Sequence, residues 1–122
     1  MTTRVLIADD DAMIRDVLRD VLDNEADLEV VAVARDAVEA VALAEQHVPA
    51  VAVLDVRMSG GGGVTAACEI LRRLPSTRIL AFSAYQEAAA MQEMAGAGAI
   101  EYLVKGIPNV EIVAAVRRAA TA

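Results

Sequence analysis

Several residue types that mark particular classes of protein are scarce or missing in this sequence. Cys68 is the only cysteine among 122 residues, so no disulfide can form within the chain. Tryptophan is absent, and the aromatic side chains are only Phe82, Tyr85 and Tyr102, too few for the stacking platform of a single-strand nucleic-acid binder. Positive charge is also in deficit, because 11 Lys and Arg stand against 18 Asp and Glu and leave a net charge of -7. Such a charge repels phosphate backbones and anionic lipid, so we expect no direct nucleic-acid binding and no membrane partner.

Long hydrophobic runs are missing as well. The uncharged apolar stretches, such as residues 50–54, are far shorter than the roughly 20 residues that a membrane helix needs. The first apolar run, residues 5–8, is too short for the hydrophobic region of a secretory signal. Together with the single cysteine, this predicts a cytoplasmic location. With 57% hydrophobic residues, the chain has enough apolar side chains for one core, and we expect residues 1–122 to form one domain.

What the sequence does contain is an alternation of short apolar runs with segments of helical periodicity. The runs read as five strands, at Val5–Ala8, Glu29–Ala34, Ala50–Leu54, Arg78–Phe82 and Ala99–Val104. The intervening segments read as helices whose apolar stripes contain Ile14, Val17, Leu18 and Val21; Val38, Val41 and Ala42; Ala67, Ile70 and Leu71; the segment 87–95; and Ile112, Ala115, Val116 and Ala119. Because the strands are apolar along their length instead of alternating, both of their faces are expected to be buried. This predicts an α/β fold with a doubly wound parallel sheet covered by helices.

Polar residues close four of the five apolar runs. Asp9 and Asp10 follow the first run, Asp55 the third, Ser83 the fourth and Lys105 the fifth. In an open parallel sheet the functional crevice lies beyond the carboxyl ends of the strands. We therefore expect these side chains to meet at one edge of the sheet.

Three carboxylates at one edge repel one another unless a cation lies among them, and oxygen ligands favour a hard ion such as Mg²⁺. Asp55 can then act as a nucleophile toward phosphorus, giving an acyl phosphate. Lys105 and Ser83 supply an ammonium and a hydroxyl that can hold the phosphoryl oxygens.

The residues Asp9-Asp10, Asp55 in the segment 55–58, Ser83-Ala84, Tyr102 and Lys105 resemble the receiver domain of two-component response regulators, the CheY-like family. The resemblance covers essentially the whole chain. It implies a flavodoxin-like (βα)5 fold with strand order 2-1-3-4-5. It also implies a signalling domain, not a turnover enzyme, in which Asp55 accepts a phosphoryl group from a histidine kinase, a phosphotransfer protein or a small phosphodonor.

The same resemblance assigns roles within the site. Asp10 is expected to bind Mg²⁺ directly and Asp9 mainly through water, with Asp55 and the backbone carbonyl of Arg57 completing the set. Ser83 and Tyr102 are implied to form a switch, which changes the surface of the fourth helix, fifth strand and fifth helix. We further expect Arg57 and Tyr85 to flank the path of the water that hydrolyses the acyl phosphate.

Two positions depart from the family pattern. Gly106 follows Lys105, where proline is usual, and this predicts a more flexible turn that fixes Lys105 less firmly. Ser59 stands where proline is frequent, and the segment Gly60–Gly63 comes next. We expect this loop beside Asp55 to be unusually mobile.

Simpler interpretations exist for single residues. Asp11 is expected to cap the first helix and is left out of the site, and Ser83 taken alone suits the cap of the fourth helix. Tyr102 taken alone reads as an ordinary strand aromatic. Cys68 is expected in or near the core, between Ala67 and Leu71 on a helical face.

Two other functions stay open at this point. One is a phosphate-independent, receiver-like adaptor or dimerisation module. The other is a phosphatase of the aspartyl-phosphate type, which the sequence disfavours because Arg57 stands where such enzymes carry a second aspartate as general acid. A homodimer and a C-terminal output domain in a longer protein also stay open.

Overall fold

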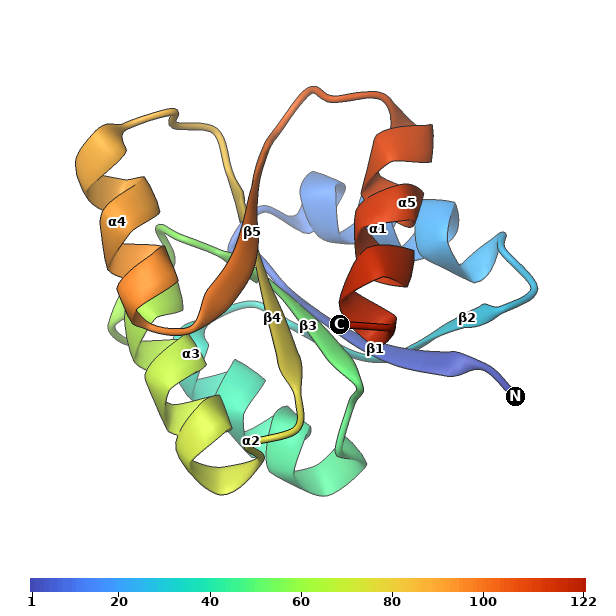
Figure 1. Cartoon of the computed structure of the whole chain (residues 1–122), viewed down its shortest axis with the longest axis horizontal. Coiled ribbons are helices and arrows are strands. Elements are labelled where there is room, and N and C mark those ends of the chain that lie inside the picture. Colours follow the sequence, from blue (N-terminus) through green and yellow to red (C-terminus); the bar gives the residue numbers. More distant parts are fainter.

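The computed structural model describes all 122 residues, in five strands and five helices that alternate along the chain (Figure 1). The elements are β1 (Thr3–Ala8), α1 (Ala12–Asp23), β2 (Leu28–Ala34), α2 (Ala37–His47), β3 (Val51–Asp55), α3 (Gly62–Arg73), β4 (Arg78–Ser83), α4 (Ala88–Gly96), β5 (Ala99–Val104) and α5 (Asn109–Ala120). All strand pairs are parallel, and their order is β2-β1-β3-β4-β5. The expected flavodoxin-like topology is confirmed. No helix is both long and apolar enough to cross a bilayer.

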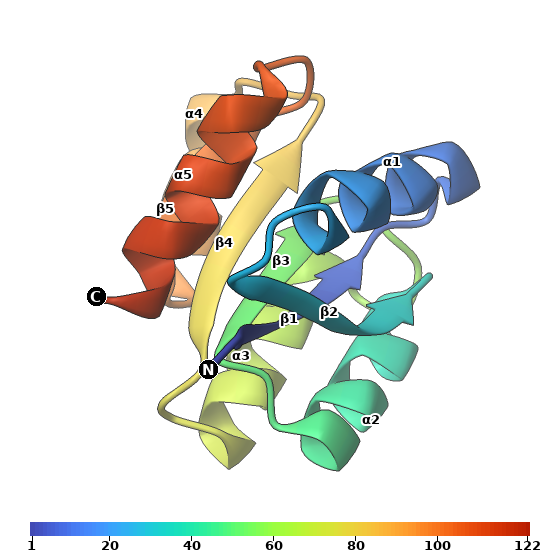
Figure 2. The ribbon, with the colours of Figure 1, turned by 90° about the vertical axis from the view of Figure 1, so that its right-hand side faces the viewer.

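The sheet separates two layers of helices. In Figures 1 and 2, α1 and α5 lie together on one face, and α2, α3 and α4 cover the other. Successive side chains of the central strands point to opposite faces of the sheet and so contribute to both apolar clusters. In β1, Val5 and Ile7 join the cluster under α1 and α5, whereas Leu6 and Ala8 join the cluster under α2 and α3. This alternation explains why the strands are apolar at every position.

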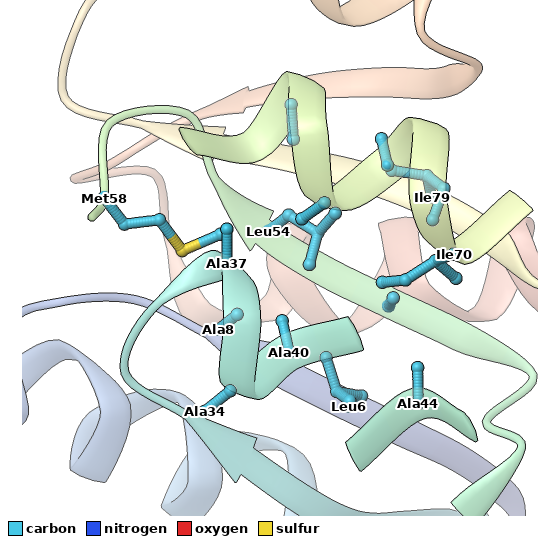
Figure 3. Close-up of a cluster of buried hydrophobic side chains, with 14 of the residues drawn as sticks. Leu6, Ala8, Ala34, Ala37, Ala40, Ala44, Leu54, Met58, Ile70 and Ile79 are labelled. Atoms are coloured by element: carbon cyan, nitrogen blue, oxygen red, sulfur yellow. The ribbon is translucent and has the colours of Figure 1, made fainter. Parts of the chain in front are cut away.

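The two apolar clusters differ in the size of their side chains. The cluster under α2 and α3 is rich in alanine, including Ala37, Ala40 and Ala44 of α2 (Figure 3). Ala66 and Ala67 of α3 belong to the same cluster. The cluster under α1 and α5 is built mostly of leucine, isoleucine and valine. Small side chains permit close approach of the helix backbone to the sheet. On this side, replacing the buried alanines with larger residues would disturb the close packing of the helices against the sheet.

Four expectations about helix faces are wrong. Val17 of α1 is 47% exposed and Val38 of α2 is 68% exposed, and Ala42 of α2 and Cys68 of α3 are also exposed. In α1 the buried side chains are Leu18 and Leu22. In α2 the buried positions are alanines, which a pattern that weights large apolar residues does not select. For Cys68, the adjacent Ala67 and Ala66 occupy the buried stripe instead.

The turn between β3 and α3 has a defined backbone that needs glycine. Gly60, Gly61 and Gly62 have φ angles of 84°, 107° and 75°, a region that residues with a Cβ atom rarely adopt. The Ser59 carbonyl accepts a hydrogen bond from the Ala37 amide at 2.9 Å, and the Gly63 amide donates to the Val56 carbonyl at 2.9 Å. The glycines thus serve a particular turn geometry that joins Asp55 to α3.

Gly63 is required by a close contact, and we expect its replacement to be costly. A Cβ atom at this position would lie 2.6 Å from the Asp55 carbonyl oxygen, whereas one at Gly96 would meet nothing within 4 Å. Gly63→Ala should lower the free energy of unfolding by about 1–3 kcal/mol, because α3 must move away from β3. Urea unfolding followed by far-UV circular dichroism measures this directly.

Gly96→Ala is the matched control, and it should be neutral or stabilise by up to about 1 kcal/mol, since alanine favours helix. Equal unfolding curves for the two variants would contradict the close packing described for Gly63.

Candidate functional site

The topology brings the expected site residues to one edge of the sheet. Ala8 at the end of β1 pairs with Leu54 of β3, so Asp9 and Asp55 stand next to each other on adjacent strands. Ser83 ends β4 beside Val104 of β5, and Lys105 follows directly. The strand order reverses between β1 and β3, and this is where ligands bind in open parallel sheets.

Lys105 lies between two buried carboxylates. Its Nζ is 2.8 Å from Asp9 Oδ2 and 3.5 Å from Asp55 Oδ1. The Asp9 side chain is fully buried and that of Asp55 is 5% exposed. The Lys105 amide also donates to the Ser83 carbonyl at 2.8 Å. Both ends of the lysine are therefore held, although Gly106 follows it.

Asp9 and Asp55 are fixed further by backbone amides. Asp9 Oδ1 accepts from the Asp11 amide at 2.9 Å, and Asp55 Oδ1 accepts from the Arg57 amide at 3.4 Å. Asp9 Oδ2 is buried and, apart from the ion pair with Lys105, has no hydrogen-bond partner. The single ammonium of Lys105 is therefore shared by two buried carboxylates, and a further cation would add to the compensation of their charge.

Asp10 completes a group of three acids. It is exposed, and one carboxylate oxygen each from Asp9, Asp10 and Asp55 lie within 4.8 Å of one another. Asp10, Asp55 and Lys105 line a hollow of about 270 Å³ together with Asp11, Arg57, Ala84 and Tyr85. Asp11 also caps α1, as expected, because its side chain accepts from the amides of Met13 and Ile14.

The charges of the site shift the protonation of Asp55 and Lys105. Burial raises the pKa of Asp55 to about 6, the charge of Asp9 adds to the rise, and Lys105 opposes it. Burial works to lower the pKa of Lys105, but its contacts with Asp9 and Asp55 outweigh burial and the pKa is raised. At neutral pH the Lys105 side chain is therefore a charged ammonium, and the Asp55 carboxyl loses its proton only when the pH rises to about 6.

The turn after β4 is held by two hydroxyl groups. Ser83 Oγ accepts from the Tyr85 amide at 3.1 Å, and the Tyr102 hydroxyl donates to the Tyr85 carbonyl at 2.6 Å. Ser83 is therefore not the cap of α4, because Glu87 occupies that position. Ser83 and Tyr102 lie on neighbouring strands and bind the same residue.

Arg57 covers this turn from the other side. Its guanidinium carbon lies 4.1 Å from the centroid of the Tyr85 ring, and its Nη2 lies 2.7 Å from Glu87 Oε1. Arg57 and Tyr85 are among the residues expected near the site. Glu87 is not, because nothing in its sequence context sets it apart from the other glutamates.

The chain matches a known protein family and several characterised relatives. The profile of the response regulator receiver domain matches residues 5–117. The chain is 37% identical over 114 residues to the DNA-binding transcriptional activator DevR/DosR of Mycobacterium tuberculosis, a match that covers 93% of this chain and 52% of the relative. It is 35% identical over 115 residues to the oxygen regulatory protein NreC of Staphylococcus epidermidis, covering 93% and 53%. The chain thus spans about half the length of the curated relatives it matches.

Solved structures of response regulators have the same fold as this chain. The two-component response regulator of the LuxR family from Aurantimonas sp. superposes with a TM-score of 0.93 at 30% identity, covering 99% of this chain and 86% of that one. The response regulator domain of Thermotoga maritima CheB superposes with a TM-score of 0.89 at 28% identity, covering 100% and 98%.

The raised pKa of Asp55 predicts a pH-dependent cost to stability in the absence of metal. The folded protein keeps the Asp55 proton up to about pH 6, whereas the ordinary value is 3.8. Between these values the folded state binds more protons than the unfolded state, so the stability that Asp55 contributes falls as pH rises. Asp55→Asn should therefore raise the free energy of unfolding at pH 7.5 by about 1–2 kcal/mol and have little effect below pH 4.

Urea titrations with EDTA at several pH values measure this difference. Asp11→Asn is the control, since asparagine also caps helices and Asp11 makes no ion pair with Lys105. An Asp55→Asn variant less stable than the wild type at pH 7.5 would contradict the prediction.

Proposed function

Because the chain belongs to the family of response regulator receiver domains, we propose that it is a phosphoacceptor in a two-component or phosphorelay system, with Asp55 as the acceptor. The observation that carries the proposal is the ammonium of Lys105 between the buried carboxylates of Asp9 and Asp55. Receiver domains are signalling domains. On this proposal the only chemistry of residues 1–122 is transfer of a phosphoryl group to Asp55 and its later hydrolysis.

Mg²⁺ fits the acids of this site. The carboxylates of Asp9, Asp10 and Asp55 lie close together, the buried Asp9 Oδ2 is paired with Lys105 alone, and the donor set consists only of oxygen, as Mg²⁺ prefers. Asp10, Asp55 and the backbone carbonyl of Arg57 would hold the ion directly, and Asp9 through water. The ion would offset the charge of the carboxylates and of the phosphoryl oxygens.

Asp55 is suited to attack phosphorus. Its carboxylate oxygen forms the new bond to phosphorus, while the bond from phosphorus to the imidazole nitrogen of a phosphohistidine, or to the oxygen of a small donor, breaks with its electron pair. Lys105, 3.5 Å from Asp55 Oδ1, is positioned to pair with a phosphoryl oxygen. The Ser83 hydroxyl can donate to another.

The switch follows from competition for the Ser83 hydroxyl. In this structure Ser83 Oγ accepts from the Tyr85 amide, and Tyr102 binds the Tyr85 carbonyl. A Ser83 hydroxyl that turns toward a phosphoryl group loosens its bond to Tyr85 and so changes the preferred position of Tyr102. Tyr102 lies beside the apolar groove between α4 and β5, where Met91 and Ile100 are 40% and 44% exposed. We propose that phosphorylation changes the surface of α4, β5 and α5 by this shift in population.

Partners follow from the same proposal. The phosphoryl donor would be a histidine kinase or a phosphotransfer protein. Because the chain spans about half of its curated relatives, and DevR/DosR is named as a DNA-binding transcriptional activator, we propose that residues 1–122 are the receiver domain and control an output domain in a longer protein or a separate partner.

The first test is phosphorylation by a small donor. After incubation with acetyl phosphate and Mg²⁺, intact mass spectrometry should show one adduct of about 80 Da, the mass of a phosphoryl group. Asp55→Asn, Asp10→Asn and a sample with EDTA should show none, because the nucleophile or the metal is missing.

Asp11→Asn is the matched control, since Asp11 lines the same hollow but caps α1, and it should keep the adduct. A folded wild-type protein that binds Mg²⁺ yet forms no adduct would overturn the proposal and favour the phosphate-independent adaptor.

The second test concerns the lifetime of the acyl phosphate. Arg57 and Tyr85 line the hollow beside Asp55, so we expect them to hinder the water that attacks phosphorus. Replacing both with alanine should speed dephosphorylation by about tenfold, which corresponds to ~1.4 kcal/mol in the barrier. Loss of the adduct with time, measured after removal of the donor, gives the rate. An unchanged rate would rule out this role.

A further inference from the structure

Glu87 makes an ion pair that its place in the chain does not require. It stands at the N-cap of α4, yet its side chain accepts no hydrogen bond from that helix. Asp11 and Asp36, at the same positions of α1 and α2, both cap their own helices. The Glu87 carboxylate instead pairs with Arg57 from the turn after β3, at 2.7 Å.

The ion pair determines where the Arg57 side chain lies. One nitrogen of the guanidinium binds Glu87, and the face of the same group covers the Tyr85 ring at 4.1 Å. Tyr85 is fixed independently, because Ser83 and Tyr102 bind its backbone. Arg57 has a long, half-exposed side chain that loses much rotamer freedom when it is held in one place, so its position depends on these two contacts.

Arg57 separates two hollows on the surface. One, of about 270 Å³, contains Asp55, Asp10 and Lys105. The other, of about 290 Å³, contains Glu87, Gly61 and Glu93. Because Arg57 lines both hollows, we infer that its side chain is part of the wall between them, and its movement toward solvent would open the first hollow on the side of α4.

We propose that Glu87 is a positioning residue that holds Arg57 against Tyr85 and thereby sets how long a phosphoryl group survives on Asp55. The inference rests on the proposed function. In hydrolysis, a water oxygen bonds to phosphorus, the bond from phosphorus to the Asp55 oxygen breaks with its electron pair to leave a carboxylate, and both water protons leave with the inorganic phosphate. Glu87 touches none of these atoms and acts only through Arg57.

The effect should be modest and sensitive to salt. Arg57 and Glu87 are 53% and 52% exposed, and exposed ion pairs change a population by a few-fold at most. Glu87→Gln should therefore speed dephosphorylation by about two- to five-fold at low salt. Raising the salt to about 1 M screens exposed charges, so the wild-type rate should rise toward that of the variant, whose own rate should change little.

Two comparisons isolate the ion pair. Glu93→Gln removes the same charge from α4 and from the same hollow, where Glu93 makes no ion pair, and it should behave like the wild type. In an Arg57→Ala background, Glu87→Gln should have no further effect, because the group that it positions is gone. All rates are measured from the loss of the phosphoryl mass adduct in excess Mg²⁺.

A second measurement needs no phosphoryl group. In the wild type and in Glu93→Gln, nuclear Overhauser contacts should join the Arg57 side chain to the Tyr85 ring protons, and Glu87→Gln should weaken or abolish them. Contacts that persist in Glu87→Gln would overturn the positioning role. Contacts that disappear while dephosphorylation stays unchanged, or becomes slower, would overturn the effect on lifetime and leave the proposed function standing. A wild type that takes up no phosphoryl group would instead refute the proposed function and, with it, the effect on lifetime.

Discussion

The Lys105 ammonium between Asp9 and Asp55 is the interaction on which the rest of the site depends. Two buried carboxylates on adjacent strands repel each other, and an uncompensated charge in the interior is strongly unfavourable. Lys105 reaches both from the end of β5, two strands away from β3. It can do so only because parallel strands end at one edge of the sheet. Burial, together with the charge of Asp9, still raises the pKa of Asp55 to about 6, although Lys105 opposes the rise.

The second constraint is the path of the backbone around Asp55. Gly60, Gly61 and Gly62 make a turn with left-handed φ angles, and Gly63 brings α3 against the Asp55 carbonyl. The Ser59 carbonyl joins the same turn to the start of α2. Asp55 is therefore closely packed on the side of α2 and α3. On the side of α4, Asp55 is bordered by two partly exposed side chains, Arg57 and Tyr85.

Much of the fold, and the gathering of the polar residues at one edge of the sheet, could be predicted from the sequence. The strands lie where the apolar runs are, because burial of both faces leaves a pattern that does not depend on tertiary detail. Helix faces were harder. Val17 and Val38 point outward while alanines occupy the buried stripe of α2, since a layer packed close to the sheet accepts only small side chains. The sequence led us to expect a mobile loop at Gly60–Gly63. In the structure this segment forms a turn whose left-handed φ angles require glycine.

By itself, the sequence determined which polar groups gather and at which edge of the sheet. Asp9, Asp10, Asp55, Ser83 and Lys105 each follow or end an apolar run, and parallel strands end at the same edge. Only the tertiary structure decided how these groups are held. The Tyr85 backbone lies between Ser83 and Tyr102, and Arg57 bridges to Glu87, 30 residues away along the chain. The physical reason is that a strand buried on both faces leaves a continuous apolar run in the sequence, which can be recognised without knowing what the strand packs against. An ion pair between two exposed side chains depends on the distance between two turns, and that distance exists only once the sheet has formed.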